Sequence, residues 1–167
     1  HGIFVAGKKH LLLPGSGNKD GTLMKYTGDG KFLAKFGKQG PTAGSQDSTA
    51  LGGTASIALD AQANELFLSD GYFNHRVIVL DADSLAYKRM WGAYGKAPTD
   101  MKLPNFNPKS EAFANPVHCL RIAHDGLVSV CDRATAPHQV CQKHAPQLNG
   151  VWRRADTHGP DAYPKRR

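Results

Sequence analysis

The sequence predicts an all-β protein built from repeated four-stranded units, and three observations support this fold class. Short segments rich in β-branched and aromatic residues alternate with turns that contain Asp, Asn, Gly and Ser. This arrangement recurs along the chain at a nearly constant interval. No segment of the 167 residues has the periodicity of an amphipathic helix. Because four-stranded repeats of roughly 40–55 residues are typical of β-propeller blades, we expect a partial propeller.

The repeat is clearest in the middle of the chain, where polar turns separate four short predicted strands. These strands cover residues 57–59, 65–68, 77–80 and 87–91. The first part of the chain has the same layout, since Ile3 lies 54 residues before Ile57 and Phe36 lies 55 residues before Trp91. A third copy begins around Leu120, which lies 63 residues after Ile57.

These offsets divide one domain, residues 1–150, into blades at about 1–40, 54–95 and 115–150. A blade needs neighbours to bury both of its faces, and closed propellers have about four to eight blades, so three blades predict an arc of a larger ring. The segment 97–113 is rich in Pro, Asn and Lys, and we expect it to form a surface loop between blades. The basic tail, residues 151–167, lacks apolar alternation and is predicted to be disordered.

The composition limits the classes of function. A hydrophobic content of 40% supports a packed core. No run of about 18 apolar residues is present, so no membrane span is predicted. The net charge is +7, but the last sixteen residues hold five Lys or Arg against two Asp. The remaining positive charge is spread thinly, so a nucleic-acid or anionic-membrane surface is not indicated.

The three cysteines, Cys119, Cys131 and Cys141, contain no CxxC pair. A disulfide between Cys119 and Cys131 is geometrically feasible if they lie on neighbouring strands, but the spacing leaves the pairing open. Cys141 and His144 have the spacing of half a zinc site. Without a second pair at a suitable distance, a zinc site there is disfavoured.

The turn "SDGYFNH", followed by the strand "RVIVL", carries larger side chains than a turn requires. Asp70, Asn74 and Arg76 are interpreted as structural. Asp and Asn side chains accept or donate backbone hydrogen bonds in turns, and an Arg at the start of a strand can connect blades. Tyr72 suits a structural or a functional role equally at this point.

The segments "DGYFNHRVIVLD", "DGKFLAKFG" and "YKRMWG" together resemble the NHL-repeat family of six-bladed β-propellers. Within that family, the likeness is greatest to the peptidyl-α-hydroxyglycine α-amidating lyases and their bacterial relatives. It extends over about residues 2–132 and rests on three short pieces: "HG" in the first blade, "DGYFN-R" in the second, and "PVH" with "CDR" in the third. The resemblance implies that this chain is a fragment of such a ring, with about three NHL-type blades.

The same resemblance implies a zinc site and a lyase reaction. In that family, a His at the start of an innermost strand binds zinc, and the matching positions here are His1 and His118, with Ala55 between them in the repeat. Catalytic roles are implied for the Tyr of the "DGY" loop, Tyr72, and for the Arg of the "DR" pair, Arg133. The implied reaction splits a carbinolamide into a peptide amide and glyoxylate. A structural calcium ion in the channel is a further implication.

The chain also departs from the family pattern. A third His from a later blade and an Arg from an earlier blade are missing, so only part of the site is expected and little activity is expected from this chain alone. The expected ligand is a peptide or small-molecule substrate in the propeller channel. An exported compartment, secreted or periplasmic, is favoured over the cytoplasm because relatives of this kind are often exported.

Two alternatives stay open. A propeller without chemistry could hold a protein or peptide partner through loops such as 97–113. RNA binding, which some NHL domains show, requires a basic face that bears aromatic residues. Lys88, Arg89 and Trp91 form the cluster that hints at such a face. Strand alternation predicts that Lys88 and Arg89 point to opposite faces, so nucleic-acid binding is disfavoured.

Overall fold

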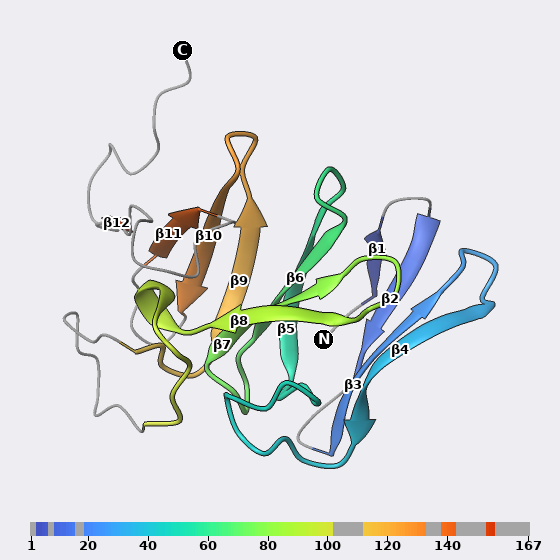
Figure 1. The fold of residues 1–167 in the computed structure, drawn as a ribbon, viewed down its shortest axis with the longest axis horizontal. Coiled ribbons are helices and arrows are strands. Elements are labelled where there is room, and N and C mark those ends of the chain that lie inside the picture. Colours follow the sequence, from blue (N-terminus) through green and yellow to red (C-terminus); the bar gives the residue numbers. More distant parts are fainter. Residues whose placement is uncertain are drawn as a thin grey trace.

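A computed structural model describes residues 3–6, 9–15, 19–101, 112–132, 138–142 and 153–155, the last two segments by their backbone alone. The described residues form three four-stranded antiparallel sheets and a 3₁₀ turn at Ala93–Gly95 (Figure 1). The all-β fold class is therefore confirmed, and the arrangement is that of part of a β-propeller. No helix in these segments is long and apolar enough to cross a membrane.

The three sheets are three blades that follow one another along the chain, and in each the strands pair in chain order. The first blade comprises β1 (Phe4–Ala6), β2 (His10–Pro14), β3 (Asp20–Tyr26) and β4 (Phe32–Gln39). The second comprises β5 (Thr54–Asp60), β6 (Glu65–Asp70), β7 (Arg76–Asp81) and β8 (Tyr87–Trp91). The third comprises β9 (Val117–Ile122), β10 (Leu127–Asp132), β11 (His138–Gln142) and β12 (Arg153–Ala155).

Two predicted segments are described only in part. In the tail 151–167, for which disorder was predicted, the structure has the strand β12, and the other residues of that tail lie outside the described residues. In the predicted loop 97–113, residues 97–101 and 112–113 are described and contain no strand or helix. The carboxylate of Asp100 accepts hydrogen bonds from the backbone N–H and the hydroxyl of Ser45, which attaches the start of this loop to the connection between the first and second blades.

The strand registers confirm that Ile57 and Leu120 are equivalent positions in the repeat. Ile57 pairs with Leu68 across β5 and β6, and Leu120 pairs with Val130 across β9 and β10. In each blade the paired residue on the second strand lies two positions before an Asp. Ile3 lies directly before β1, so the equivalence in the first blade rests on the register of the neighbouring Phe4 with Leu12.

The same registers place a β-bulge at one position of two blades. Thr54 pairs with Asp70 and Ser56 with Ser69, so Ala55 is the extra residue in β5. In β9 the extra residue is His118, which lies between the paired Val117 and Cys119. Ala55 and His118 are therefore equivalent, as the spacing of the repeat predicted.

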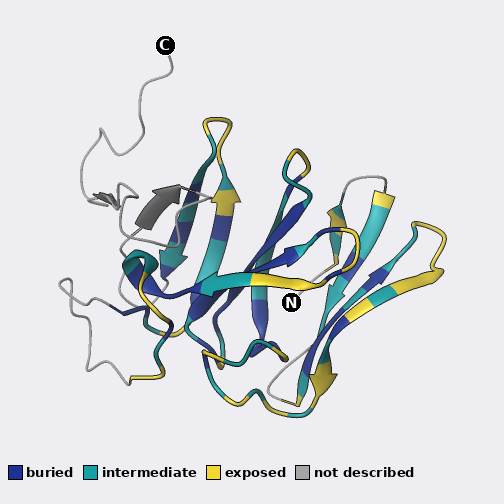
Figure 2. Ribbon diagram, viewed as in Figure 1, coloured by how far each residue is buried: buried dark blue, intermediate teal, exposed yellow. Residues whose placement is uncertain are grey.

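The core lies between the blades, in two clusters of buried apolar residues (Figure 2). Alternation along β6 sends Leu66 and Leu68 toward the first blade and Phe67 toward the third. The strands β6 and β7 are consequently buried on both faces and are continuous apolar runs, as strands covered on two sides are. The second blade is thus the centre of the packed structure.

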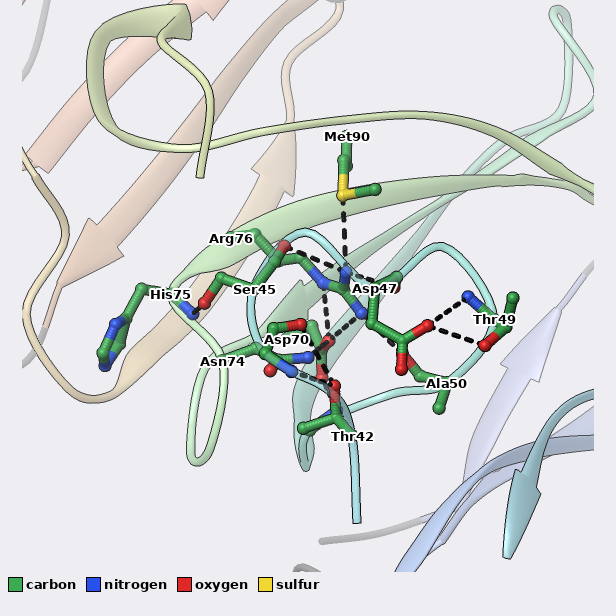
Figure 3. A network of polar contacts seen from close by, with 12 residues as sticks. Thr42, Ser45, Asp47, Thr49, Ala50, Asp70, Asn74, His75, Arg76 and Met90 are labelled. Atoms are coloured by element: carbon green, nitrogen blue, oxygen red, sulfur yellow. Dashed lines mark hydrogen bonds and ion pairs between the residues drawn. The ribbon is translucent and has the colours of Figure 1, made fainter. Parts of the chain in front are cut away.

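Arg76 connects the second blade to the segment that leads into it from the first (Figure 3). Its side chain is fully buried, and both Nε and Nη2 lie 2.8 Å from Oδ2 of Asp70. The remaining N–H groups donate to the backbone carbonyls of Ser45, Asp47 and Ala50. All five guanidinium donors are therefore satisfied, which a buried cation requires.

Asp70 is equally enclosed. Burial raises the pKa of its carboxyl, while the charge of Arg76 and hydrogen bonds from the Asn74 amide and the Gly52 N–H act in the opposite direction. These contacts agree with the structural interpretation of Asp70, Asn74 and Arg76, none of which has exposed surface for a substrate.

A lysine connects the same two blades at another point. Lys25 on β3 is only 4% exposed, and its ammonium donates to the carbonyls of Ala82 (2.7 Å) and Asp83 (3.2 Å) in the turn after β7. The Asp83 carboxylate lies 3.8 Å away. The ammonium group thus keeps polar partners although its stem crosses an apolar interface.

The outer flank of the first blade is open to solvent. Ile3 and Val5 are 65% and 72% exposed. Their repeat equivalents in the second blade, Ile57 and Leu59, pack against the apolar cluster between the first and second blades. Branched residues at matching positions are therefore covered in one blade and uncovered in the other, as expected for a flank that another blade covers in a ring.

We predict that Arg76→Met strongly destabilises the chain. Removal of one partner of a buried ion pair leaves an uncompensated charge, here that of Asp70, and costs about 3–5 kcal/mol. Denaturant unfolding measures the change, with Arg121→Met as the control because Arg121 is exposed and should alter stability by no more than about 0.5 kcal/mol. Equal unfolding midpoints for the two variants would contradict the role of Arg76.

We also predict that the isolated chain self-associates through the open flank. Val5→Lys should shift the sedimentation profile toward monomer, because a charge on the flank opposes burial of its apolar surface. Met101→Lys is the matched control, since Met101 is 60% exposed but lies in the loop after the second blade. A wild-type chain that stays monomeric at all concentrations would argue against an unsatisfied flank.

Candidate functional site

Tyr72 and His118 come from different blades and meet at the junction between them. Tyr72 lies in the loop between β6 and β7, and His118 lies near the start of β9. Their ring centroids are 6.0 Å apart and the ring planes are inclined by 72°, an edge-to-face contact. Both side chains are half-buried, so each retains some contact with solvent. The structure therefore brings together two of the four residues predicted for the site.

The bulge in β9 explains the exposure of His118. In a regular strand, residues point alternately to the two faces of the sheet, and the extra residue of a bulge is turned away from that pattern. Val117 and Leu120, on either side, are both buried against the second blade. His118 is not required for that packing, so its imidazole is available at the end of the strand.

The loop that carries Tyr72 packs directly against β9 because it contains a glycine. A Cβ atom on Gly71 would lie 2.1 Å from the carbonyl oxygen of Val117, closer than real contacts allow. The loop is also bonded to the segment before β5, since the N–H of Phe73 donates to the Gly52 carbonyl at 2.6 Å. Gly53 has φ +88° and no side chain, and a Cβ there would lie 2.9 Å from that of Tyr72.

The other two predicted site residues, His1 and Arg133, lie outside the described residues. Within the described part of the chain, no group of three or more His, Cys, Asp or Glu side chains could hold a metal ion. That part supplies one imidazole, His118, to the predicted zinc site, whereas zinc sites ordinarily use three or four protein ligands.

Cys119, the residue after His118, forms a disulfide with Cys131. The two residues are directly opposite each other on β9 and β10, with Cα atoms 5.1 Å apart. This resolves the pairing that the spacing alone left open. The disulfide fixes the strand end at which His118 leaves the regular pattern.

The structure corrects the predicted orientation of Lys88 and Arg89, which do not point to opposite faces. Arg89 donates two hydrogen bonds of 2.7 Å to the Glu65 carboxylate, and the Lys88 ammonium lies 3.3 Å from the same group. The pairing of β7 with β8 skips Lys88, and this bulge turns both cations to one side. Hydrogen bonds from Arg89 hold the pKa of Glu65 below its ordinary value, so an anionic partner already occupies the basic cluster.

Comparisons with known proteins provide little beyond the fold. No protein-family model and no curated protein sequence matches the chain. One solved structure, a quinohemoprotein alcohol dehydrogenase named ADHIIG from Pseudomonas putida HK5, aligns with 81% of this chain at 18% identity and a TM-score of 0.40. The chain corresponds to only 26% of that protein, and a likeness at this level says nothing about activity.

The disulfide predicts a thiol count. Under denaturing conditions without reductant, the protein should show one reactive thiol, Cys141, and after reduction it should show all three. A Cys141→Ser variant should then show none before reduction and two after it. Three reactive thiols in the unreduced, non-exchanged protein would mean that Cys119 and Cys131 are not bonded.

Proposed function

We propose that this chain is the described part of an NHL-type β-propeller enzyme similar to the peptidyl-α-hydroxyglycine α-amidating lyases. The observation that supports the proposal is the contact between Tyr72 and His118, two residues from separate blades. The resemblance assigned both to one site before their separation was known. Two chemically competent side chains, half-exposed at one blade junction, are what a site assembled across blades requires.

The proposed reaction is cleavage of a carbinolamide. Tyr72, as its phenolate, removes the proton of the substrate hydroxyl. The oxygen then forms a carbonyl with the adjacent carbon while the carbon–nitrogen bond breaks, and the amide nitrogen receives a proton as it leaves. The products are a peptide amide and glyoxylate. The step changes no oxidation state and needs no further reactant.

A phenol with an ordinary pKa of about 10 is a weak base at neutral pH, so the proposal needs positive charge near Tyr72. Arg133 is the residue proposed for that role, because a nearby cation favours the phenolate and stabilises the developing anion. His118 contacts the Tyr72 ring and is the residue through which the third blade contributes to the site.

Zinc and calcium remain proposals that rest on the resemblance. The described residues do not fit a zinc ion by themselves, because they contribute a single imidazole. His1 and further ligands would have to complete the site. The proton transfers proposed above use the chain's own side chains and do not depend on the metal.

A binding propeller without chemistry is the second candidate. Phe73, beside Tyr72 on the same anchored loop, is 46% exposed and could contact an apolar group of a peptide or protein partner. The RNA-binding alternative is weakened, because Lys88 and Arg89 are already paired with Glu65. An exported location stays a prediction.

The decisive assay measures glyoxylate released from N-benzoyl-α-hydroxyglycine by this chain and by the product of its complete reading frame, each with and without added zinc. We expect near-background activity from this chain alone and turnover by the complete protein. Tyr72→Phe should lower kcat about 10²–10⁴-fold, the usual contribution of a general base. Tyr87→Phe, a change on the exposed end of β8, is the control.

The metal part of the proposal is tested on the same samples by zinc titration. His118→Ala should weaken zinc binding by the complete protein, whereas His124→Ala, in the exposed turn after β9, should not. A complete protein that binds zinc but releases no glyoxylate would favour the binding propeller. Equal zinc affinity with and without His118 would reject the metal-ligand assignment.

A further inference from the structure

We propose that Asn115 is a positioning residue of this site: its side-chain amide holds the Tyr72 loop so that the phenol ring meets the His118 imidazole. Asn115 lies in the segment before β9, three residues ahead of His118, and belongs to the third blade. Tyr72 belongs to the second blade. The meaning of this role for catalysis rests on the proposed function, but the positioning itself does not.

The contact is direct and short. Nδ2 of Asn115 donates to the backbone carbonyl of Tyr72 at 2.6 Å. The carbonyl belongs to the same residue whose ring contacts His118, so the hydrogen bond acts at the base of the Tyr72 side chain. A shift of that carbonyl would carry the phenol with it.

A second contact crosses the same junction in the opposite direction. The hydroxyl of Ser69, at the end of β6, lies 3.3 Å from the backbone carbonyl of His118 and 3.3 Å from that of Ser56. One side chain of the second blade therefore reaches the backbone of His118, and one side chain of the third blade reaches the backbone of Tyr72. The two ring-bearing residues are each held from the opposite blade.

The other anchors of the loop do not fix this geometry. The hydrogen bonds from Tyr72 N to Gly53 O (3.3 Å) and from Phe73 N to Gly52 O (2.6 Å) bind the loop within the second blade. The position of the loop relative to β9 depends on contacts across the junction, where the absent Cβ of Gly71 allows close approach and the Asn115 amide supplies a donor.

The location of Asn115 separates positioning from stability. The residue is exposed, and the bond lies at the surface of the junction, so its loss leaves no buried polar group without a partner. The apolar cluster between the second and third blades does not include Asn115. Its substitution should therefore disturb the Tyr72–His118 contact while the blades stay packed.

The test compares Asn115→Asp, which keeps the shape but replaces the amide donor by a carboxylate, with Asn115→Ala and with Asn115→Gln. Gln62→Glu, in the exposed turn after β5, controls for the added negative charge. The first readout is the nuclear Overhauser effect between the Tyr72 and His118 ring protons in the full chain. The second is the unfolding transition of each variant.

We expect Asn115→Asp and Asn115→Ala to reduce the ring-to-ring effect at least fivefold while the unfolding transition stays cooperative and close to that of the wild type. Asn115→Gln, which retains a donor on a longer arm, should restore part of it, and Gln62→Glu should leave it unchanged. A wild-type ring contact in Asn115→Asp would overturn the proposal. So would loss of the contact only in variants that also unfold.

The outcome is separable from that of the proposed function. If the ring contact is lost in Asn115→Asp and the complete protein releases no glyoxylate, the positioning role stands and the lyase proposal fails. If glyoxylate release falls while the ring contact persists, the positioning role is wrong and the lyase proposal survives.

Discussion

The buried ion pair between Arg76 and Asp70 is the interaction on which the rest of the structure depends. Both side chains are fully buried, and such a pair is tolerated only when every donor and acceptor has a partner. The chain meets that requirement by bringing the backbone carbonyls of Ser45, Asp47 and Ala50 to the guanidinium group. The connection from the first blade is therefore held against the second blade by polar bonds, in addition to the apolar cluster between them.

The same pair frames the candidate site. Asp70 ends β6 and Arg76 begins β7, so the loop that carries Tyr72 starts and ends at the two partners of the ion pair. A loop closed in this way presents its side chains from a fixed base, as binding and catalytic loops on rigid scaffolds do. On the facing blade, the bulge at His118 and the disulfide of Cys119 define the other half of the junction. The contact between the two rings follows from these independent constraints.

The sequence was sufficient to predict the strands of the repeat, because alternation and turn composition are local signals. It also predicted that Ile57, Leu120 and their neighbours are equivalent, since a constant offset relates the blades. It could not predict features that depend on the pairing of strands. The bulge at Lys88 reversed an expectation based on strict alternation, and Lys25, a charged residue in a strand, is buried because carbonyls of the next blade lie within its reach. Asn115 carried no signal, because an Asn before a Pro is ordinary in a connecting segment.

The most direct test of the central claim is the rate at which the side-chain N–H protons of Arg76 exchange with solvent, measured by NMR at neutral pH. A guanidinium whose five donors are all bonded inside the protein should exchange only when the blades separate, at a rate that follows global unfolding. Arg121, which is exposed, should exchange too fast to observe under the same conditions. Fast exchange of Arg76 in the folded chain would show that the ion pair is open to solvent and would contradict this account.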